Sequence, residues 1–186
     1  MTADESKPAD ESEPTDESVV ADGAEPAGPL WEDLLADASA IAEEYREDGW
    51  DAVVLDPTGV SPVDRDERIG LDVTVSAEEY EVVETLIEEG DVTITSANVY
   101  YRPLAADGSD RRVALTVERD ESSETAIFVP LTYDISACRD IFEPALLEEE
   151  LLTHVTTDST DRWVSFSHDD PSLFLEESDV RAWKAN

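Results

Sequence analysis

Residues 111–134, RRVALTVERDESSETAIFVPLTYD, decide the fold because two segments of alternating character flank a short polar turn. Apolar side chains recur at every second position in each segment: Val113, Leu115 and Val117 in the first, and Ile127, Val129, Leu131 and Tyr133 in the second. A period of two is typical of strands with a buried face. Residues 120–124 between them are polar and suit a turn, so an antiparallel hairpin is predicted.

A third strand is predicted immediately before this hairpin, over residues 91–104. Its apolar positions change parity between Ile94 and Ala97, which indicates a bulge near Ser96. The Ala106-Asp107-Gly108 sequence then predicts a reversal of the chain. Together these segments predict a three-stranded antiparallel meander.

The region before the meander is predicted to contain two helices and two strands. An amphipathic helix is predicted from Leu30 to Gly49, with apolar residues spaced by three and four: Trp31, Leu34, Leu35, Ala38, Ile41, Ala42 and Tyr45. Residues 50–55 form a short, nearly continuous apolar run, which predicts a central strand buried on both faces, and a charged loop follows. Alternation over residues 71–75 predicts a second strand. Ser76 and Glu79 then match a capping box that starts a helix ending at Gly90.

The region after the meander predicts a helix over residues 135–142 that Pro144 interrupts or restarts, with Leu146 and Leu147 in a second piece. A hairpin is expected from residues 151–157 and 162–167, followed by a short last helix containing Leu173 and Phe174. The predicted class is α+β, a mixed, mostly antiparallel sheet with helices packed largely on one face. Residues 30–186 are predicted to form a single domain.

Charge dominates the composition of the 186-residue chain. Asp and Glu number 48 against 12 Lys and Arg, a formal net charge of −36, and the two lysines are Lys7 and Lys184. Residues 1–29 hold nine of the acids with no aromatic residue, which predicts a disordered acidic tail; the alternative is an arm that docks on a partner. Because 40% of the residues are apolar, a folded core is still expected.

The acidic residues are spread over the whole chain, which favours adaptation to salt over one basic partner. The self-repulsion of such a chain is largely screened at about 1 M salt, where the Debye length is roughly 3 Å. Many acids with almost no lysine resemble the proteins of halophilic archaea that accumulate salt. Nucleic-acid binding is not expected, since no cluster of Lys or Arg is present to contact phosphates.

Cys138 is the single cysteine, so neither an internal disulfide nor a cysteine-based zinc site is expected. It could act as a nucleophile only beside a histidine, and lone cysteines are more often packing residues. The N-terminal sequence lacks the pattern of a signal peptide, and no stretch is apolar enough to span a membrane. A cytoplasmic protein without a cofactor is therefore expected.

His154, His168 and Asp169 are the candidate catalytic residues. A histidine near a carboxylate can act as a general base or bind a metal. If the hairpin turns near residue 159, His154 faces residue 164 and His168 lies roughly 13 Å farther along the strands, too far for a shared metal ion. The alternative is that His154 is a surface residue of a strand and that residues 168–171 form a loop capping the last helix.

Trp163, Arg102 and Arg112 are the candidate ligand-binding residues. Trp163 lies between the two histidines in sequence, and the two arginines flank the predicted turn at residues 106–108, where they could meet an anionic ligand. The alternative is that the arginines pair with neighbouring acids. No glycine-rich phosphate loop, dinucleotide fingerprint or nucleophile elbow is present.

Three short sequences carry a resemblance to a known family: Tyr45-Arg46-x-x-Gly49-Trp50-Asp51, Glu124-Thr125-Ala126 and Leu152-Thr153-His154-Val155. From residues 31–35 to residues 167–171 the chain resembles a family of small acidic haloarchaeal proteins of unknown function. The resemblance implies a saline cytoplasm but no reaction, ligand or catalytic residue.

Two functions remain open from the sequence. The first is a non-enzymatic interaction or regulatory module, with an unknown protein partner. The second is a small enzyme or ligand-binding domain with a polar site around His154 and His168. A concave pocket converging on the histidines would favour the second function, and a convex charged surface the first.

The charge predicts that folding strengthens markedly as KCl rises from low to molar concentration, because screening removes the repulsion between carboxylates. Thermal unfolding followed by circular dichroism across that range measures the effect. Equal melting temperatures at both ends of the range would refute the halophilic interpretation.

Overall fold

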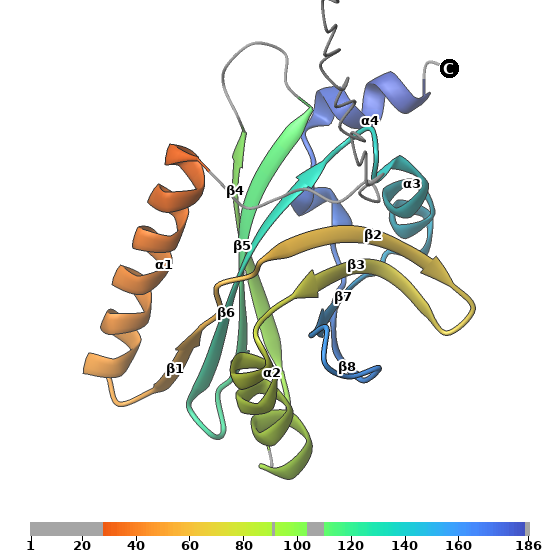
Figure 1. Cartoon of the computed structure of the whole chain (residues 1–186). Coiled ribbons are helices and arrows are strands. Elements are labelled where there is room, and N and C mark those ends of the chain that lie inside the picture. The colour runs from red at the N-terminus through yellow and green to blue at the C-terminus, as the bar shows by residue number, and fades with distance from the viewer. Residues whose placement is uncertain (1–27, 91, 104–109, 185–186) are drawn as a thin grey trace, which may run out of the picture.

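The computed structural model describes residues 28–184, apart from residue 91 and residues 104–109, and the side chains of residues 101–103 are not described either. The predicted turn at residues 106–108 and residues 1–27 of the predicted tail lie outside the described residues. Helices and strands contribute comparably to the fold, which confirms the α+β class (Figure 1).

The first sheet contains the predicted meander. Strands β4 (Ser96–Pro103), β5 (Arg111–Asp120) and β6 (Thr125–Asp134) pair antiparallel in chain order, and β1 (Asp51–Val54) joins β6 in parallel to give the order β1-β6-β5-β4. The meander is therefore confirmed. At its β5–β6 turn Asp120 accepts hydrogen bonds from Ser122, Ser123 and the Thr93 amide, which lower its pKa to about 2.

A second sheet has the order β2-β3-β7-β8. Strand β2 (Gly59–Arg65) pairs antiparallel with β3 (Arg68–Thr74), β3 pairs parallel with β7 (Leu151–Thr156), and β7 pairs antiparallel with β8 (Trp163–His168). The parallel β3–β7 contact joins segments about 80 positions apart in the chain, which no local pattern reveals. The hairpin predicted from residues 151–157 and 162–167 is confirmed.

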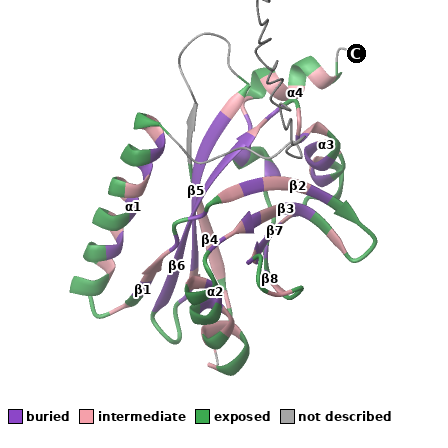
Figure 2. Ribbon diagram, viewed as in Figure 1, coloured by how far each residue is buried: buried purple, intermediate pink, exposed green. Residues whose placement is uncertain are grey.

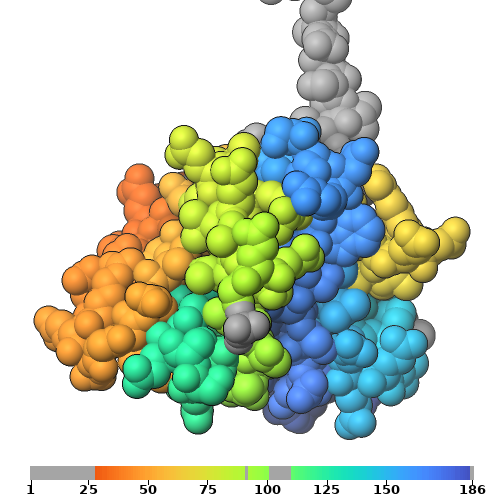
Figure 3. Space-filling model, turned by 90° about the horizontal axis from the view of Figure 1, so that it is seen from below, coloured from red at the N-terminus to blue at the C-terminus, as the bar shows by residue number. Residues whose placement is uncertain are grey.

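Helices complete the layers. They are α1 (Pro29–Glu47), α2 (Ala77–Glu84) with the π-helical turn η1 (Thr85–Glu89), α3 (Arg139–Glu148), the 3₁₀ helix η2 (Pro171–Phe174) and α4 (Glu177–Lys184). Helix α1 packs on one face of the first sheet and stands apart from the second sheet (Figure 1). From below, the yellow-green segment containing α2 lies between the α1 side and the β7–β8 side (Figure 3).

Two apolar clusters hold these layers together. The smaller lies between α1 and the first sheet and includes Trp31 and Leu34 of α1 together with Val117 and Phe128 of the sheet. The larger fills the space between the two sheets and extends to α2 and α3. The middle strands β5 and β6 are therefore buried along most of their length (Figure 2).

The capping box at the start of α2 is confirmed. Ser76 Oγ accepts from the Glu79 amide at 3.2 Å, and the Glu79 carboxylate accepts in return from the Ser76 amide at 3.2 Å. These two bonds satisfy backbone donors that a helix start leaves free. The local pattern was sufficient here because the partners are three residues apart.

The prediction that residues 50–55 form a central strand is wrong in position. Strand β1 is at the edge of the first sheet and pairs with β6 alone. Its apolar run is explained by burial on both faces, since Ala52 packs toward α1 and Val53 packs against the cluster between the sheets. Two covered faces do not require two neighbouring strands.

The prediction of a charged loop before residue 71 is also wrong, since β2 and the start of β3 occupy this region. Pro62 and the charged residues near the turn concealed the pattern. Proline removes a backbone donor and is tolerated on an edge strand, and β2 is the edge strand of its sheet.

Three further boundaries differ from prediction. Strand β4 begins at Ser96, so the change in parity marks the start of the strand and not a bulge. Helix α3 starts at Arg139 and continues through Pro144. The predicted last helix is the 3₁₀ helix η2, whose Ser172 amide donates to the Asp170 carboxylate, and α4 after it was not predicted.

At Gly70 the backbone of β3 passes close to the start of β7. The φ of Gly70 is +145°, and a Cβ atom there would lie 2.1 Å from the Leu152 carbonyl oxygen and 3.2 Å from Nε2 of His154. Both the conformation and the contact exclude a side chain without movement of the backbone.

The substitution Gly70→Ala should therefore destabilise the protein by about 3 kcal/mol or more. Gly59→Ala is the matched control, because a Cβ atom at Gly59 meets no atom within 4 Å and its φ is ordinary. The control should change stability by less than about 1 kcal/mol. Chemical denaturation of both variants in molar KCl compares them, and equal effects would contradict the close-approach argument.

Candidate functional site

The outer face of the second sheet carries two polar rows that follow from strand register. Thr74, Thr156 and Trp163 face one another across β3, β7 and β8, and the neighbouring row on the same face is Asp72, His154 and Ser165. The register places Val73, Val155 and Val164 in a row on the other face, within the cluster between the sheets. Strand alternation therefore gives this sheet one apolar face and one polar face.

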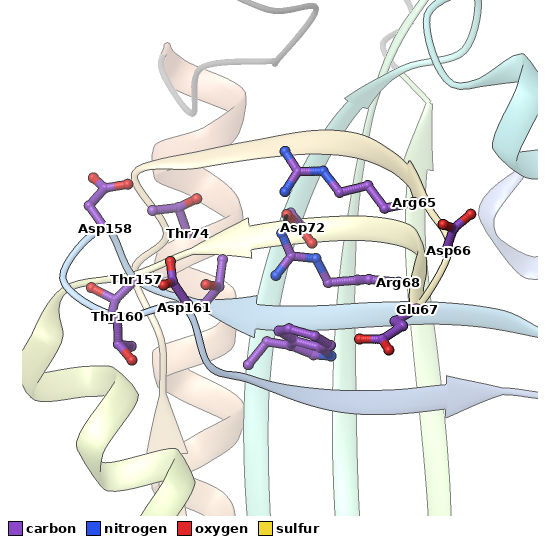
Figure 4. A pocket seen from close by; sticks show the side chains of 12 residues that line it. Arg65, Asp66, Glu67, Arg68, Asp72, Thr74, Thr157, Asp158, Thr160 and Asp161 are labelled. Carbon is purple, nitrogen blue, oxygen red and sulfur yellow. Dashed lines mark ion pairs between the residues drawn. The ribbon is translucent and has the colours of Figure 1, made fainter.

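A pocket of about 710 Å³ lies over the polar rows. Its side chains come from the β2–β3 turn, the strands and the β7–β8 loop (Figure 4). They comprise two arginines, five carboxylates, four threonines and a tryptophan: Arg65, Arg68, Asp66, Glu67, Asp72, Asp158, Asp161, Thr74, Thr156, Thr157, Thr160 and Trp163. We refer to it as the outer pocket.

Arg68 is held in place at the centre of the outer pocket. Its guanidinium lies 3.0 Å from the Asp72 carboxylate and 4.6 Å from the ring centroid of Trp163. The side chains of Arg68 and Asp72 are only 13% and 14% exposed, so the pair is shielded from solvent. Burial raises the pKa of Asp72, and the positive charge of Arg68 opposes this increase.

The Arg68–Asp72 pair is not fully hydrogen bonded. Within the described residues, Arg68 Nε and Asp72 Oδ1 have no hydrogen-bond partner, although both atoms are buried. One of these atoms is a donor and the other an acceptor. Arg65, in contrast, is exposed, extends over the same face and makes no ion pair within the described part of the chain (Figure 4).

His154 faces Asp72 across β3 and β7, beneath the Arg68–Asp72 pair, and is 1% exposed. Its Nε2 is 3.0 Å from the carbonyl oxygen of Ile69, and its Nδ1 is 2.7 Å from Oγ of Ser165. A carbonyl oxygen only accepts, so Nε2 carries the proton and Nδ1 accepts from the serine hydroxyl. Burial lowers the pKa of His154, in agreement with a neutral ring.

The prediction that His154 lies on the surface of a strand is wrong, and so is the predicted register. His154 faces Ser165 and not residue 164, so His168 lies an odd number of positions farther along β8. A shift of one residue reverses the face of a strand side chain. The two histidines therefore lie on opposite faces of the sheet and form no common site.

His168 is buried on the inner side, 3% exposed. Its Nε2 lies 3.1 Å from Oε1 of Glu118 on β5 and 3.4 Å from Oγ1 of Thr153. Glu118 was missed because it is one of 48 acids. Glu118 alternates with Val117 along β5 and shares the second face of the strand with Ala114 and Thr116, and this face is buried as well.

The other candidates are dispersed. Asp169 is exposed beside His168 and does not orient its ring through any described hydrogen bond. The guanidinium of Arg112 lies 3.1 Å from the Asp179 carboxylate of α4. Arg112 does not line the outer pocket. The side chain of Arg102 lies outside the described residues. Of the candidates, Trp163 lines the outer pocket and His154 supports it.

Residues 17–176 match a family of unknown function, DUF7529. The chain belongs to this family. Searches of curated proteins and of solved structures found no significant match. In the described residues no group of three or more His, Cys, Asp or Glu side chains could hold a metal ion. No helix in the same residues has the length and apolar content needed to span a bilayer.

The lowered pKa of His154 predicts a pH dependence of stability. The unfolded state takes up a proton at a higher pH than the folded state, so His154 lowers stability as pH falls below about 6.5. Asp72 acts in the opposite sense, because its raised pKa lets the folded state bind a proton at a higher pH than the unfolded state does.

Relative to a His154→Gln variant, the wild type should therefore lose stability between pH 7.5 and 5.5, at up to roughly 1.4 kcal/mol per pH unit for one proton. Denaturation at a fixed molar KCl concentration measures the difference between the two proteins. A constant difference across this range would show that the ring is not held neutral in the folded state.

Proposed function

We propose that this protein is a non-catalytic ligand-binding domain whose outer pocket binds a small, neutral, hydroxyl-rich molecule such as a sugar or polyol. The observation that carries the proposal is the largely shielded Arg68–Asp72 pair, which offers one unused donor and one unused acceptor. A hydroxyl group both accepts and donates, so a small movement of the pair would let one ligand hydroxyl satisfy both atoms.

The composition of the pocket argues against an anionic ligand. Five carboxylates against two guanidinium groups give the pocket a net negative charge, which disfavours an anion. Four threonine hydroxyls and the exposed carboxylates provide many hydrogen-bond partners for hydroxyl groups. The volume of about 710 Å³ is within the usual range for small-molecule sites.

The arrangement also favours binding over catalysis. Both ring nitrogens of His154 have partners, so this histidine is not free to accept a proton from a ligand. The pocket wall contains no histidine, cysteine or lysine. Arg68 is held between Asp72 and Trp163, which reduces the entropy lost when a ligand binds.

We infer the cellular setting from the charge alone. A net charge of −36 with two lysines fits a saline cytoplasm of a haloarchaeon, where screening would stabilise the fold. A neutral ligand suits that setting, because its hydrogen bonds are less sensitive to screening than a surface ion pair. A regulatory role would follow if binding changed the contacts of the domain with a protein partner.

The test is a titration of the protein in molar KCl with glucose, gluconate and glucosamine, which share most of their skeleton and differ in charge. Calorimetry should detect binding of glucose, and gluconate should bind at least tenfold more weakly because the pocket is acidic. Larger neutral sugars should be tested in parallel, since the pocket has room for more than one ring.

Variants connect the binding to the pocket. Asp72→Asn and Thr156→Val should each weaken sugar binding, with about a tenfold or greater effect for the charged hydrogen bond of Asp72. Glu81→Gln, on the exposed side of α2, is the matched control and should bind as the wild type does. Binding that survives Asp72→Asn unchanged, or that favours gluconate, would contradict the proposal.

A further inference from the structure

A second cavity, of about 350 Å³, lies between the first sheet and the C-terminal end of β8. Its wall includes Thr95 and Val99 near or on β4, His168 and Asp169 at the end of β8, and Leu173 of η2. None of these residues lines the outer pocket. The cavity is thus separate from the site of the proposed function, and we refer to it as the inner cavity.

His168, which lines the inner cavity, is buried beside Glu118. The side chains of His168 and Glu118 are 2% and 0% exposed, and their closest atoms, Nε2 and Oε1, are 3.1 Å apart. That distance suits an ion pair, but no well-directed hydrogen bond reaches either carboxylate oxygen within the described residues. Buried carboxylates without such bonds are costly unless a positive charge lies beside them.

A protonated His168, an imidazolium, would supply that charge. Glu118 has no other cation within ion-pair distance in the described part of the chain. An imidazolium carries a proton on both nitrogens, and one of them faces Glu118 and Thr153. The other, Nδ1, is buried and has no hydrogen-bond partner in the described residues. In an imidazolium it would be a donor that lacks an acceptor, and a small movement of the ring would bring it to the surface of the cavity.

The remaining wall defines what kind of acceptor fits. Asp169 and Asp170 add two exposed carboxylates, while no lysine or arginine lines the inner cavity, so an anionic acceptor would be repelled. Ile94, Val99 and Leu173 supply an apolar surface, and Leu173 is 46% exposed although it is a large apolar residue. A neutral group with an oxygen acceptor and an apolar neighbour matches both features.

We propose that the inner cavity is a second binding site, in which Nδ1 of His168 donates to the carbonyl oxygen of a small neutral molecule with a branched apolar group. Glu118 is the positioning residue that holds the imidazolium. The ring of His168 also packs edge-on against Phe174, with centroids 5.3 Å apart, which fixes its orientation. The site involves no covalent step.

Three probes of similar shape test the proposal: isovaleramide, isovalerate and isoamylamine. They share a branched apolar group and differ in the head group, which is a neutral carbonyl, an anion or a cation without an acceptor. Each is titrated into the full chain labelled with ¹⁵N-histidine in molar KCl, and the ring signals of His168 are followed by NMR. The His154 signals serve as an internal reference for the outer face.

Isovaleramide should shift the His168 signals saturably, and isovalerate and isoamylamine should each bind at least tenfold more weakly. The substitutions His168→Asn and Leu173→Ala should reduce isovaleramide affinity, as measured by the signals of ligand methyl groups. Leu173→Ala matters because this partly exposed position is expected to tolerate the change even if His168→Asn fails to fold. Glu118→Gln should weaken binding at least tenfold by removing the charge that holds the imidazolium.

The control is His154→Gln, which should leave isovaleramide affinity unchanged because His154 lies on the opposite face of the sheet. Absence of a saturable shift, equal binding of isovalerate or isoamylamine, or unchanged affinity in Leu173→Ala would overturn the proposal. Glucose binding in the outer pocket is measured separately, so failure at one site leaves the result at the other intact.

Discussion

The burial of β6 on both faces is the constraint on which the structure depends. Ala126 and Phe128 pack toward α1, while Ile127, Val129 and Leu131 pack toward the second sheet. A strand with two apolar faces cannot rest at the surface, so both a helix and a second sheet must cover it. This requirement fixes the order of the layers: helix, first sheet and second sheet.

The same constraint determines where a polar site can form. The second sheet uses its inner face to cover β6, and its outer face is then free to carry polar side chains. Gly70 permits the close contact of β3 and β7 near His154, and β7 in turn aligns Thr156 and His154 with Trp163 and Ser165 of β8. The outer pocket is therefore the solvent side of a sheet whose other side serves the core.

Local sequence patterns predicted much of the fold, and failed where long-range contacts decide. The capping box at Ser76 and the meander follow from residues close in the chain, and both were predicted. Strand β2 was missed because Pro62 and nearby charges masked it, and β1 was misplaced because burial by α1 looks like burial by neighbouring strands. No local signal predicts that β3 pairs with β7, so the division into two sheets could not be derived.

The site residues show the same limit more sharply. Trp163 and His154 were selected because they differ chemically from their surroundings, but a register error of one residue placed His154 and His168 on the same face.

Glu118 could not be selected by type in a chain with so many acids. Within the described residues, its distinguishing property is that both of its carboxylate oxygens are buried without a hydrogen-bond partner, whereas the equally buried Asp120 is hydrogen bonded. Most acidic residues of this protein lie on its surface, so residue type does not identify a functional acid. Burial and hydrogen bonding distinguish a functional acid from one that serves solubility. By that criterion Asp72 and Glu118, one on each side of the second sheet, are the two acids whose environments call for a functional explanation.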